Sequence, residues 1–215
     1  MLDYLLQIIP TIADGLKVTV SLFCIVWILS IPGGILMAML RLSKLPLVDK
    51  LVDAFVYLMR GTPLMLQILF VYYALPIITD GAIQMDDATA AVLTFVLNYA
   101  AYLCEIFRGG IQSISRGQYE GAKVLGFTYA QTMRKIILPQ ATKLMLPNFV
   151  NQFVIALKDT TIVSAIGLVE LFQTGKIIIA RNYQSFKMYA ILAVFYLVII
   201  TLLTRFAKKL EKKVN

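Results

Sequence analysis

"VTVSLFCIVWILSIPGGILMAML", residues 18–40, contains no Asp, Glu, Lys or Arg. A helix needs about 20 mostly apolar residues to cross the hydrocarbon core of a membrane, so this stretch is long enough for one crossing. Pro32, Gly33 and Gly34 interrupt it, a pattern that favours a kink. The stretch predicts that the chain is an integral membrane protein.

The composition of the whole chain agrees with this prediction. The 215 residues are 60% hydrophobic and 15% charged, with a mean hydropathy of +0.80, whereas a soluble domain is about half apolar and a quarter charged. Other charge-free runs lie at 61–79, 88–104, 144–157 and 188–204. We therefore predict a single all-α membrane domain over 1–215, with five transmembrane helices at about 16–41, 54–79, 86–107, 143–168 and 186–206.

The distribution of Lys and Arg predicts the orientation of these spans. Cations accumulate in short cytoplasmic loops, and most of the 20 Lys and Arg residues follow the first, third and fifth predicted spans. We expect the N-terminus outside and the C-terminus in the cytoplasm. Because the cations behind the net charge of +8 are spread over loops beside apolar spans, they indicate contact with anionic membrane lipid, not with nucleic acid.

Several classes of site are poorly supplied by this sequence. It has no His, and Cys24 and Cys104 both fall within predicted spans, so we expect no metal site and no disulfide framework. No Gly-rich phosphate-binding loop occurs either. We expect a chain without an enzymatic site or cofactor of its own, and any energy from ATP and Mg²⁺ would have to come through a partner chain.

A water-compatible stretch separates the third and fourth predicted spans: "QYEGAKVLGFTYAQTMRKIILPQA", residues 118–141. Its apolar residues recur at helical spacing on both sides of Gly126, which tolerates the positive φ of a turn. Thr128 and Gln131 have the spacing of a capping box, and Pro139 predicts a stop. These features predict two short amphipathic helices over 118–138, which lie on the membrane surface or dock on a cytoplasmic partner.

At this point the chain resembles a known family. Glu120, Gly121, Ala122 and Gly126, followed by Ile-x-Leu-Pro at 136–139, are similar to the EAA signature of binding-protein-dependent ABC import permeases. The stretches 60–76, 101–122 and 153–167 look like the polar amino acid branch of that family. The resemblance covers nearly the whole chain, and Gly121 is its one departure because Ala is usual there.

The resemblance implies a type I ABC importer permease fold and a set of partners. These are a second permease copy or a paralogue, two ATP-binding cytoplasmic subunits, and an extracytoplasmic amino-acid-binding protein. It also implies that the loop transmits closure of the ATPase subunits to the spans. The residues expected at this contact are Arg116, Glu120, Gly121, Ala122 and Gly126.

The fourth predicted span carries several polar residues. Asn148, Gln152, Ile155 and Asp159 share one helical stripe, and Asn151, Ile155 and Lys158 lie on an adjacent one. Ionisable groups at membrane depth usually face a bundle interior or a wet cavity. Two interpretations stay open, hydrogen bonding between helices and contact with substrate; in the second, Lys158 would meet the carboxylate of an amino acid and Asp159 its ammonium group.

Other polar residues near the membrane are weaker candidates. The sequence places Arg60, Gly61, Thr62 and Pro63 at a helix entry that serves as a structural or gate element, and Gln67 one turn deeper could line the path. Glu105 has the spacing for a salt bridge with Arg108, or it acts as a gate contact. We interpret Asn98, Tyr99 and Tyr102 chiefly as packing residues.

The function that follows is the permease subunit of an ATP-driven amino acid importer in the cell membrane of a bacterium or archaeon. In relatives that this chain resembles and that carry cationic amino acids, an acidic residue can stand where Gln152 stands, so we expect a neutral polar substrate such as glutamine or cystine. The alternatives are a self-contained channel or secondary transporter, and a membrane interaction subunit without transport activity.

Overall fold

The computed structural model describes residues 2–43 and 45–214, with side chains for 7–43, 45–209, 211 and 212. Every regular element in this described part is helical. The elements are α1 (Leu2–Arg41), α2 (Pro46–Gly61), α3 (Leu64–Leu69), the π-helical turn η1 (Phe70–Ala74), α4 (Leu75–Ile78), α5 (Asp87–Gln112), α6 (Arg116–Val124), α7 (Tyr129–Thr132), the π-helical turn η2 (Met133–Ile137), α8 (Leu138–Asp159), the 3₁₀ helix η3 (Thr160–Ile166), α9 (Leu171–Asn182) and α10 (Ser185–Val214).

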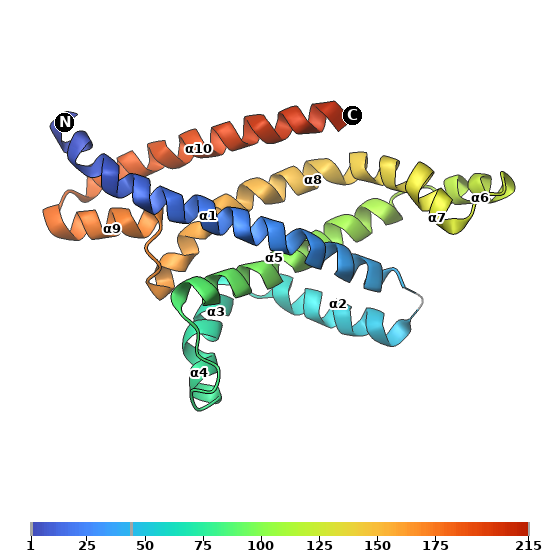
Figure 1. Ribbon diagram of the computed structural model, residues 1–215, viewed down its shortest axis with the longest axis horizontal. Helices are drawn as coiled ribbons and strands as arrows, with labels where there is room; N and C mark the ends of the chain where they lie inside the picture. Colours follow the sequence, from blue (N-terminus) through green and yellow to red (C-terminus); the bar gives the residue numbers. More distant parts are fainter. Residues whose placement is uncertain (1, 44, 215) are drawn as a thin grey trace.

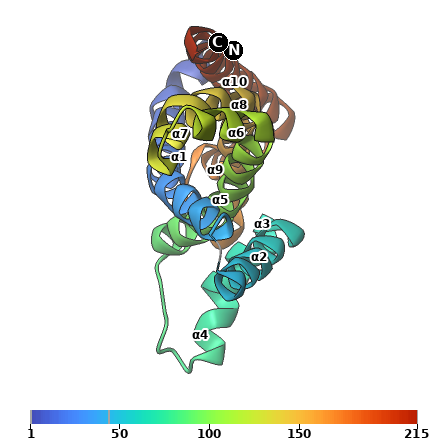
Figure 2. The same ribbon diagram turned by 90° about the vertical axis from the view of Figure 1, so that its right-hand side faces the viewer.

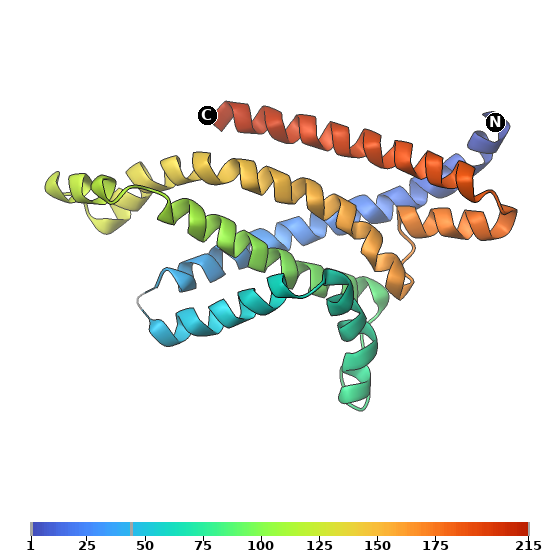
Figure 3. The same ribbon diagram turned by 180° about the vertical axis from the view of Figure 1, so that it is seen from behind.

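The long helices α1, α5, α8 and α10 run along the long axis of the molecule, and α2 lies beside α5 (Figures 1 and 3). Helices α6 and α7 lie at one end, which we call the α7 end, and α9 lies at the other, which we call the α9 end. Helix α5 is central, because it packs against α1, α2, α3 and α8.

Close packing of α1 on α5 explains the glycines in the first predicted span. A Cβ at Gly34 would lie 2.6 Å from the Cβ of Leu103, so only glycine lets the two backbones approach this closely. Leu103 itself is fully buried. Helix α1 continues through Pro32 without a break. These glycines therefore serve helix packing, where the sequence predicts a kink.

The second predicted span, 54–79, is not a single helix. Helix α2 already begins at Pro46, and Pro46–Gly61 and Leu64–Ile78 meet at 102°. Pro63 has no N–H and disfavours the α conformation of the residue before it; Thr62 is accordingly extended, with φ −116° and ψ 147°. Residues 64–78 form an arm whose first helix, α3, packs against α5 and whose last helix, α4, projects from the bundle on the side opposite α10 (Figure 2).

Four helices of the described chain are long and apolar enough to cross a membrane: Gln7–Arg41, Asp87–Gln112, Tyr129–Ile166 and Ser185–Lys209. A fifth span exists only if the bent pair α2 and α3–α4 counts as one. The predicted stop at Pro139 is wrong, because the helix continues through it. Proline has no backbone N–H to donate within a helix. The π-helical turn η2, just before Pro139, shifts the pattern of backbone hydrogen bonds at this place.

A buried carboxylate joins three elements near the α9 end. Glu170 is fully buried and accepts hydrogen bonds from the backbone N–H groups of Phe172 (2.8 Å) and Gln173 (2.7 Å) at the start of α9. It also accepts bonds from the hydroxyls of Tyr196 in α10 (3.1 Å) and Thr19 in α1 (3.4 Å). The pKa of this carboxyl lies above its usual value, because burial raises it more than these hydrogen bonds lower it. Glu170 thus caps α9 and ties it to α1 and α10.

We expect Glu170→Ala to destabilise the fold by about 2–4 kcal/mol, because several buried donors lose their acceptor at once. Asp86→Ala is the matched control. Asp86 also caps a helix, α5, but it is exposed, and it accepts a hydrogen bond from the Thr89 N–H (2.6 Å), so its loss should cost about 1 kcal/mol. Thermal unfolding in detergent measures both variants, and equal shifts in melting temperature would argue against the anchoring role.

Candidate functional site

The break between α2 and α3 is held by two amides. The side-chain N–H group of Gln67 donates to the Met59 carbonyl (2.8 Å) and to the Thr62 hydroxyl (2.7 Å). Asn98 in α5 donates to the same Met59 carbonyl (2.9 Å) and to the side-chain oxygen of Gln67 (2.9 Å). A broken helix leaves carbonyls without backbone partners, and in a membrane these need internal donors. Gln67 therefore supports the break and is absent from the lining of the cavities beside it.

Two adjoining cavities lie between the end of α2, the middle of α5, and α8. The first, of about 680 Å³, opens toward the α7 end, and its lining includes Arg60, Tyr102, Glu105, Asn148, Asn151 and Gln152. The second, of about 470 Å³, is lined by residues that include Arg60, Gly61, Thr62, Pro63, Asn98, Tyr102, Gln152, Ile155 and Asp159. Arg60, Tyr102 and Gln152 line both cavities, so the two adjoin, and we call them together the polar path.

Most of the candidates in α8 face this path. Asn148, Asn151 and Gln152 line the first cavity, and Gln152, Ile155 and Asp159 line the second. Lys158 is exposed and lies outside the lining of both. The helical stripe predicted from the sequence thus coincides with the cavity wall.

Asp159 has a defined partner on the neighbouring helix. Its carboxylate accepts a hydrogen bond of 2.7 Å from the hydroxyl of Tyr99 in α5. Tyr99 is buried, so its ring packs in the core as the sequence predicts, while its hydroxyl bonds to Asp159, which lines the second cavity. One carboxylate oxygen is fixed in this way, which orients Asp159 at the cavity wall.

Arg60 belongs to a network of charged side chains around Glu105, in which it makes the longest contact. Glu105 accepts from Arg108 (2.6 and 3.0 Å) and from Arg41 (3.1 Å), whereas its contact with Arg60 is longer, at 3.6 Å. The predicted Glu105–Arg108 salt bridge is therefore confirmed. The Arg60 guanidinium also lies over the Tyr102 ring, 5.3 Å from its centroid. Because Glu105 keeps two other guanidinium partners, Arg60 can turn toward an anion in the cavity.

The same network joins three helices. Arg41 at the end of α1 contacts Asp49 and Asp53 of α2, each at 2.7 Å, as well as Glu105 of α5. The Arg41 side chain is only 11% exposed, but Asp49 and Asp53 are 43% and 60% exposed, so water screens these two pairs more than the pair with Glu105, which is 20% exposed. The α7 ends of α1, α2 and α5 are thereby tied together.

Tyr102 and Asn98 are site residues that sequence reasoning assigned chiefly to packing. Both line the second cavity, and Tyr102 lines the first as well. A signal was present, because Asn98, Tyr102 and Glu105 recur at i, i+4 and i+7 on one face of α5. The periodicity argument used for α8 would have found them.

The predicted turn between α6 and α7 is confirmed. Gly126 has φ +76°, its N–H donates to the Lys123 carbonyl (3.0 Å), and the Phe127 N–H donates to the Ala122 carbonyl (3.0 Å). This is the Schellman pattern of a helix C-terminus. The capping box formed by Thr128 and Gln131 is also present.

The loop 116–132 presents a mixed surface at the α7 end. Arg116, Glu120 and Gly121 are exposed, whereas Ala122 is buried and faces the chain itself. Tyr119 and Met133 pack against a small core of Ile114, Ile137 and Ala141. Three large apolar side chains remain without cover in this structure, namely Val124 at 87% exposure, Leu125 at 73% and Tyr129 at 75%.

The described chain thus combines helices long and apolar enough to cross a membrane, two adjoining cavities with polar side chains in their walls, and exposed apolar side chains at the α7 end. Residues 30–215 match the family described as binding-protein-dependent transport system inner membrane component. The chain belongs to this family. It is therefore a component of a transport system rather than an enzyme.

Individual relatives match over almost the whole chain. It is 35% identical over 213 residues to the glutamine transport system permease protein GlnP of Escherichia coli (strain K12), covering 96% of this chain and 94% of that one. It is 34% identical over 207 residues to the arginine transport system permease protein ArtQ of Bacillus subtilis (strain 168), with the same coverage. A crystal structure of an amino acid ABC transporter with histidines superimposes with a TM-score of 0.90 at 31% identity, covering 98% and 97% of the two chains.

Proposed function

We propose that this chain is the permease subunit of an ATP-driven importer for polar amino acids. The observation that carries the proposal is the cavity wall formed by Arg60, Tyr102, Gln152 and Asp159. An amino acid has a carboxylate, an ammonium group and a side chain, and this wall offers a guanidinium, a carboxylate and an amide. Membership of a transport family and the similarity to amino acid permeases support the same function.

Within this proposal, Arg60 binds the substrate carboxylate and Asp159 binds the ammonium group. Arg60 suits the first role because its only ion pair among the described residues is the long contact with Glu105, and a guanidinium can bind a carboxylate through two parallel hydrogen bonds. Lys158, the other candidate for the carboxylate, lies outside the cavity lining. Asn148 and Asn151 lie further along the path toward the α7 end.

A neutral polar side chain fits the amide of Gln152. Similarity alone does not choose a substrate, because relatives named for glutamine and for arginine match at nearly equal identity. Gln152 faces both cavities and adds no negative charge. We therefore propose glutamine or cystine in preference to arginine, and competition between them for uptake into reconstituted vesicles tests this. Stronger competition by arginine would contradict it.

Gln152→Glu should shift the preference toward cationic amino acids, because a carboxylate would face the substrate side chain. We expect the ratio of arginine to glutamine uptake to rise by about tenfold, the factor that corresponds to about 1.4 kcal/mol. Gln140→Glu is the matched control, since Gln140 lies on the same helix but outside both cavities. A ratio that changes equally in the two variants would reflect net charge instead of a contact with substrate.

The α7 end is proposed to be cytoplasmic and to dock on ATPase subunits. Lys123, Arg134 and Lys135 cluster there, and Arg41 ends α1 on the same side, as expected for the cytoplasmic face. The N-terminus is then outside and the C-terminus inside. The exposed apolar tip of the loop suits a groove on a partner, which would bind ATP and Mg²⁺ itself. Glu120 and Gly121 flank this tip, and Arg116 begins α6.

A second copy of this chain, or a paralogue, is proposed to complete the path. The cavities open to the surface of a single chain, and Asn148 and Asn151 are exposed. The projecting arm also exposes Phe70, Ile77 and Ile78 on the side of the bundle opposite α10. An extracytoplasmic amino-acid-binding protein would deliver substrate at the α9 end.

A further inference from the structure

An apolar crevice lies on the face of the bundle opposite the projecting arm. It measures about 250 Å³ and is formed by α1, α8 and α10, and every side chain that lines it is apolar apart from the indole N–H of Trp27. Trp27, Phe149 and Phe153 form its floor. The centroid of the Trp27 ring lies 5.0 Å from that of Phe149 and 4.9 Å from that of Phe153. Ile28 and Phe206 stand at its rim and are 69% and 59% exposed. The residues that line the crevice are different from those that line the two cavities of the polar path.

A row of cations lies beside the crevice. Arg205, Lys208, Lys209 and Lys212 recur at i, i+3, i+4 and i+7 along α10, and all four are exposed. None of them forms an ion pair with an acidic side chain in the described part of the chain. Like charges at this spacing repel one another. An anion over this row would relieve that repulsion.

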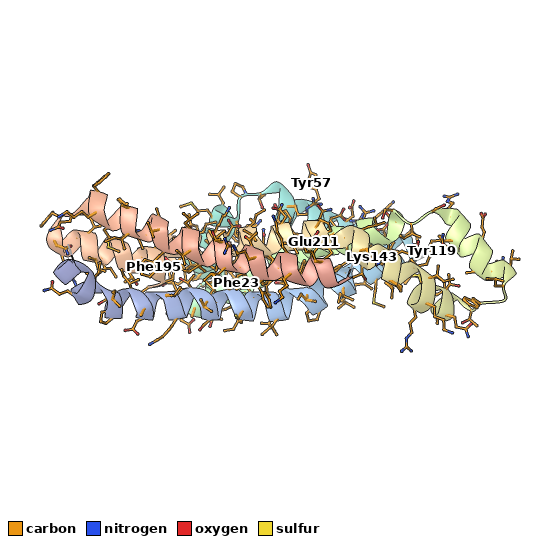
Figure 4. All side chains as sticks on the ribbon, turned by 90° about the horizontal axis from the view of Figure 1, so that it is seen from above. Phe23, Tyr57, Tyr119, Lys143, Phe195 and Glu211 are labelled. Carbon is orange, nitrogen blue, oxygen red and sulfur yellow. The ribbon has the colours of Figure 1, made fainter. Side chains whose placement is uncertain are left out.

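The cations and the crevice are adjacent on α10. Phe206 at the rim is followed at i+3 by Lys209 and preceded at i−4 by Leu202, which is 61% exposed. Along this face the surface therefore changes from apolar to basic within one helical turn. Figure 4 shows α10 from above, with Phe195 toward one end and Glu211 near the other.

We propose that the crevice is a binding site for an anionic diacyl phospholipid. One acyl chain would lie between Ile28 and Phe206 over the aromatic floor, and the phosphate would lie against Arg205 and Lys209. Helix α10 already faces the surroundings, because only 11% of its most apolar window is buried inside the chain. A second copy is the less suitable occupant, since the arm with its exposed apolar residues lies on the opposite side (Figure 2). The proposal does not depend on the transported substrate.

Trp27 gives a second, independent indication of a ligand. Its side chain is 3% exposed, and its indole N–H has no hydrogen-bond acceptor among the residues that the structure describes. A buried Trp N–H usually finds a partner. Because Trp27 lines the crevice, the ester carbonyl at the head of the bound acyl chain would supply the acceptor that the described residues lack.

Trp27 is also the only tryptophan of the chain, so its fluorescence reports on the crevice directly. The full chain is reconstituted in phosphatidylcholine vesicles that contain a small fraction of acyl-brominated phosphatidylglycerol or, in parallel, acyl-brominated phosphatidylcholine. We expect the anionic lipid to reach half-maximal quenching at an about fivefold lower mole fraction, and this preference should shrink as salt is added. Equal quenching by the two lipids, or no quenching by either because a second copy covers the crevice, would overturn the proposal.

Two pairs of variants separate the headgroup contact from the chain contact. Lys209→Gln should abolish the preference for the anionic lipid, whereas Lys187→Gln, the same charge change at the other end of α10, should leave it intact. Phe206→Ala should weaken quenching by both lipids, and Phe186→Ala, at an exposed position in the first turn of α10, should not. If the distal variants behaved like the crevice variants, the effect would come from general surface attraction, and the site would be refuted.

Discussion

Replacing Gly126 with proline should strongly reduce ATP-driven uptake while the chain still inserts into the membrane. Gly126 has φ +76°, and proline is fixed near −65°, so it cannot form this turn. The variant also loses the hydrogen bond from the Gly126 N–H to the Lys123 carbonyl. Helices α6 and α7 would then meet at another angle. We expect uptake to fall by about 5- to 150-fold, the range that corresponds to coupling free energies of about 1–3 kcal/mol.

Gly121→Ala is the matched control for this prediction. Gly121 lies within α6, and an added Cβ would meet nothing within 4 Å. Alanine favours a helix over glycine by about 1 kcal/mol, so α6 should become slightly more stable and uptake should persist. Uptake and the stimulation of ATPase activity by substrate are measured at equal amounts of membrane-inserted protein. This separates a variant that no longer couples to the ATPase from one that is missing from the membrane. Normal stimulation in Gly126→Pro would refute the role of this turn.

Arg60→Gln should raise the KM for uptake by about ten- to a hundredfold, because a hydrogen bond to a charged group contributes about 1.5–3 kcal/mol. The fold should tolerate this change, since Glu105 retains Arg41 and Arg108 as partners. The maximal rate should change less than the KM if Arg60 acts mainly in binding. Uptake kinetics at equal levels of membrane-inserted protein measure this.

Lys158→Gln separates the two candidates for the carboxylate site. Lys158 neighbours Asp159 in sequence but is exposed and lies outside the lining of both cavities. We therefore expect the KM for uptake by the Lys158→Gln variant to change by less than about threefold, because an exposed charge contributes less than about 1 kcal/mol to binding. A large rise in the KM of Lys158→Gln together with a normal KM for Arg60→Gln would assign the carboxylate to Lys158.

The local features of the fold were predictable where one principle decides them. The turn at Gly126 and the capping box at Thr128 follow from residue type and spacing, and both are present. The break after α2 was harder to predict. The run 61–79 predicted one span with a helix entry at 60–63, but not a break of this size, in which the side chains of Gln67 and Asn98 both donate to the Met59 carbonyl. That compensation depends on a contact between helices distant in sequence.

The candidate site was likewise predictable in one helix and not across helices. The stripe of Gln152, Ile155 and Asp159 follows from the period of α8, and it does line a cavity. Arg60 was assigned to a helix entry instead, because its position opposite Gln152 depends on the bend at residues 61–63. Pro139 shows a related limit, since the π-helical turn that accommodates it depends on backbone geometry that residue types alone do not specify.

Uptake of labelled glutamine into vesicles that contain the purified chain, with and without its ATPase subunit, tests the central claim most directly. We predict that uptake requires the ATPase, ATP and the binding protein together, and that an ion gradient does not replace them. Gradient-driven accumulation by the chain alone, without any ATPase subunit, would contradict the account and identify a self-contained transporter.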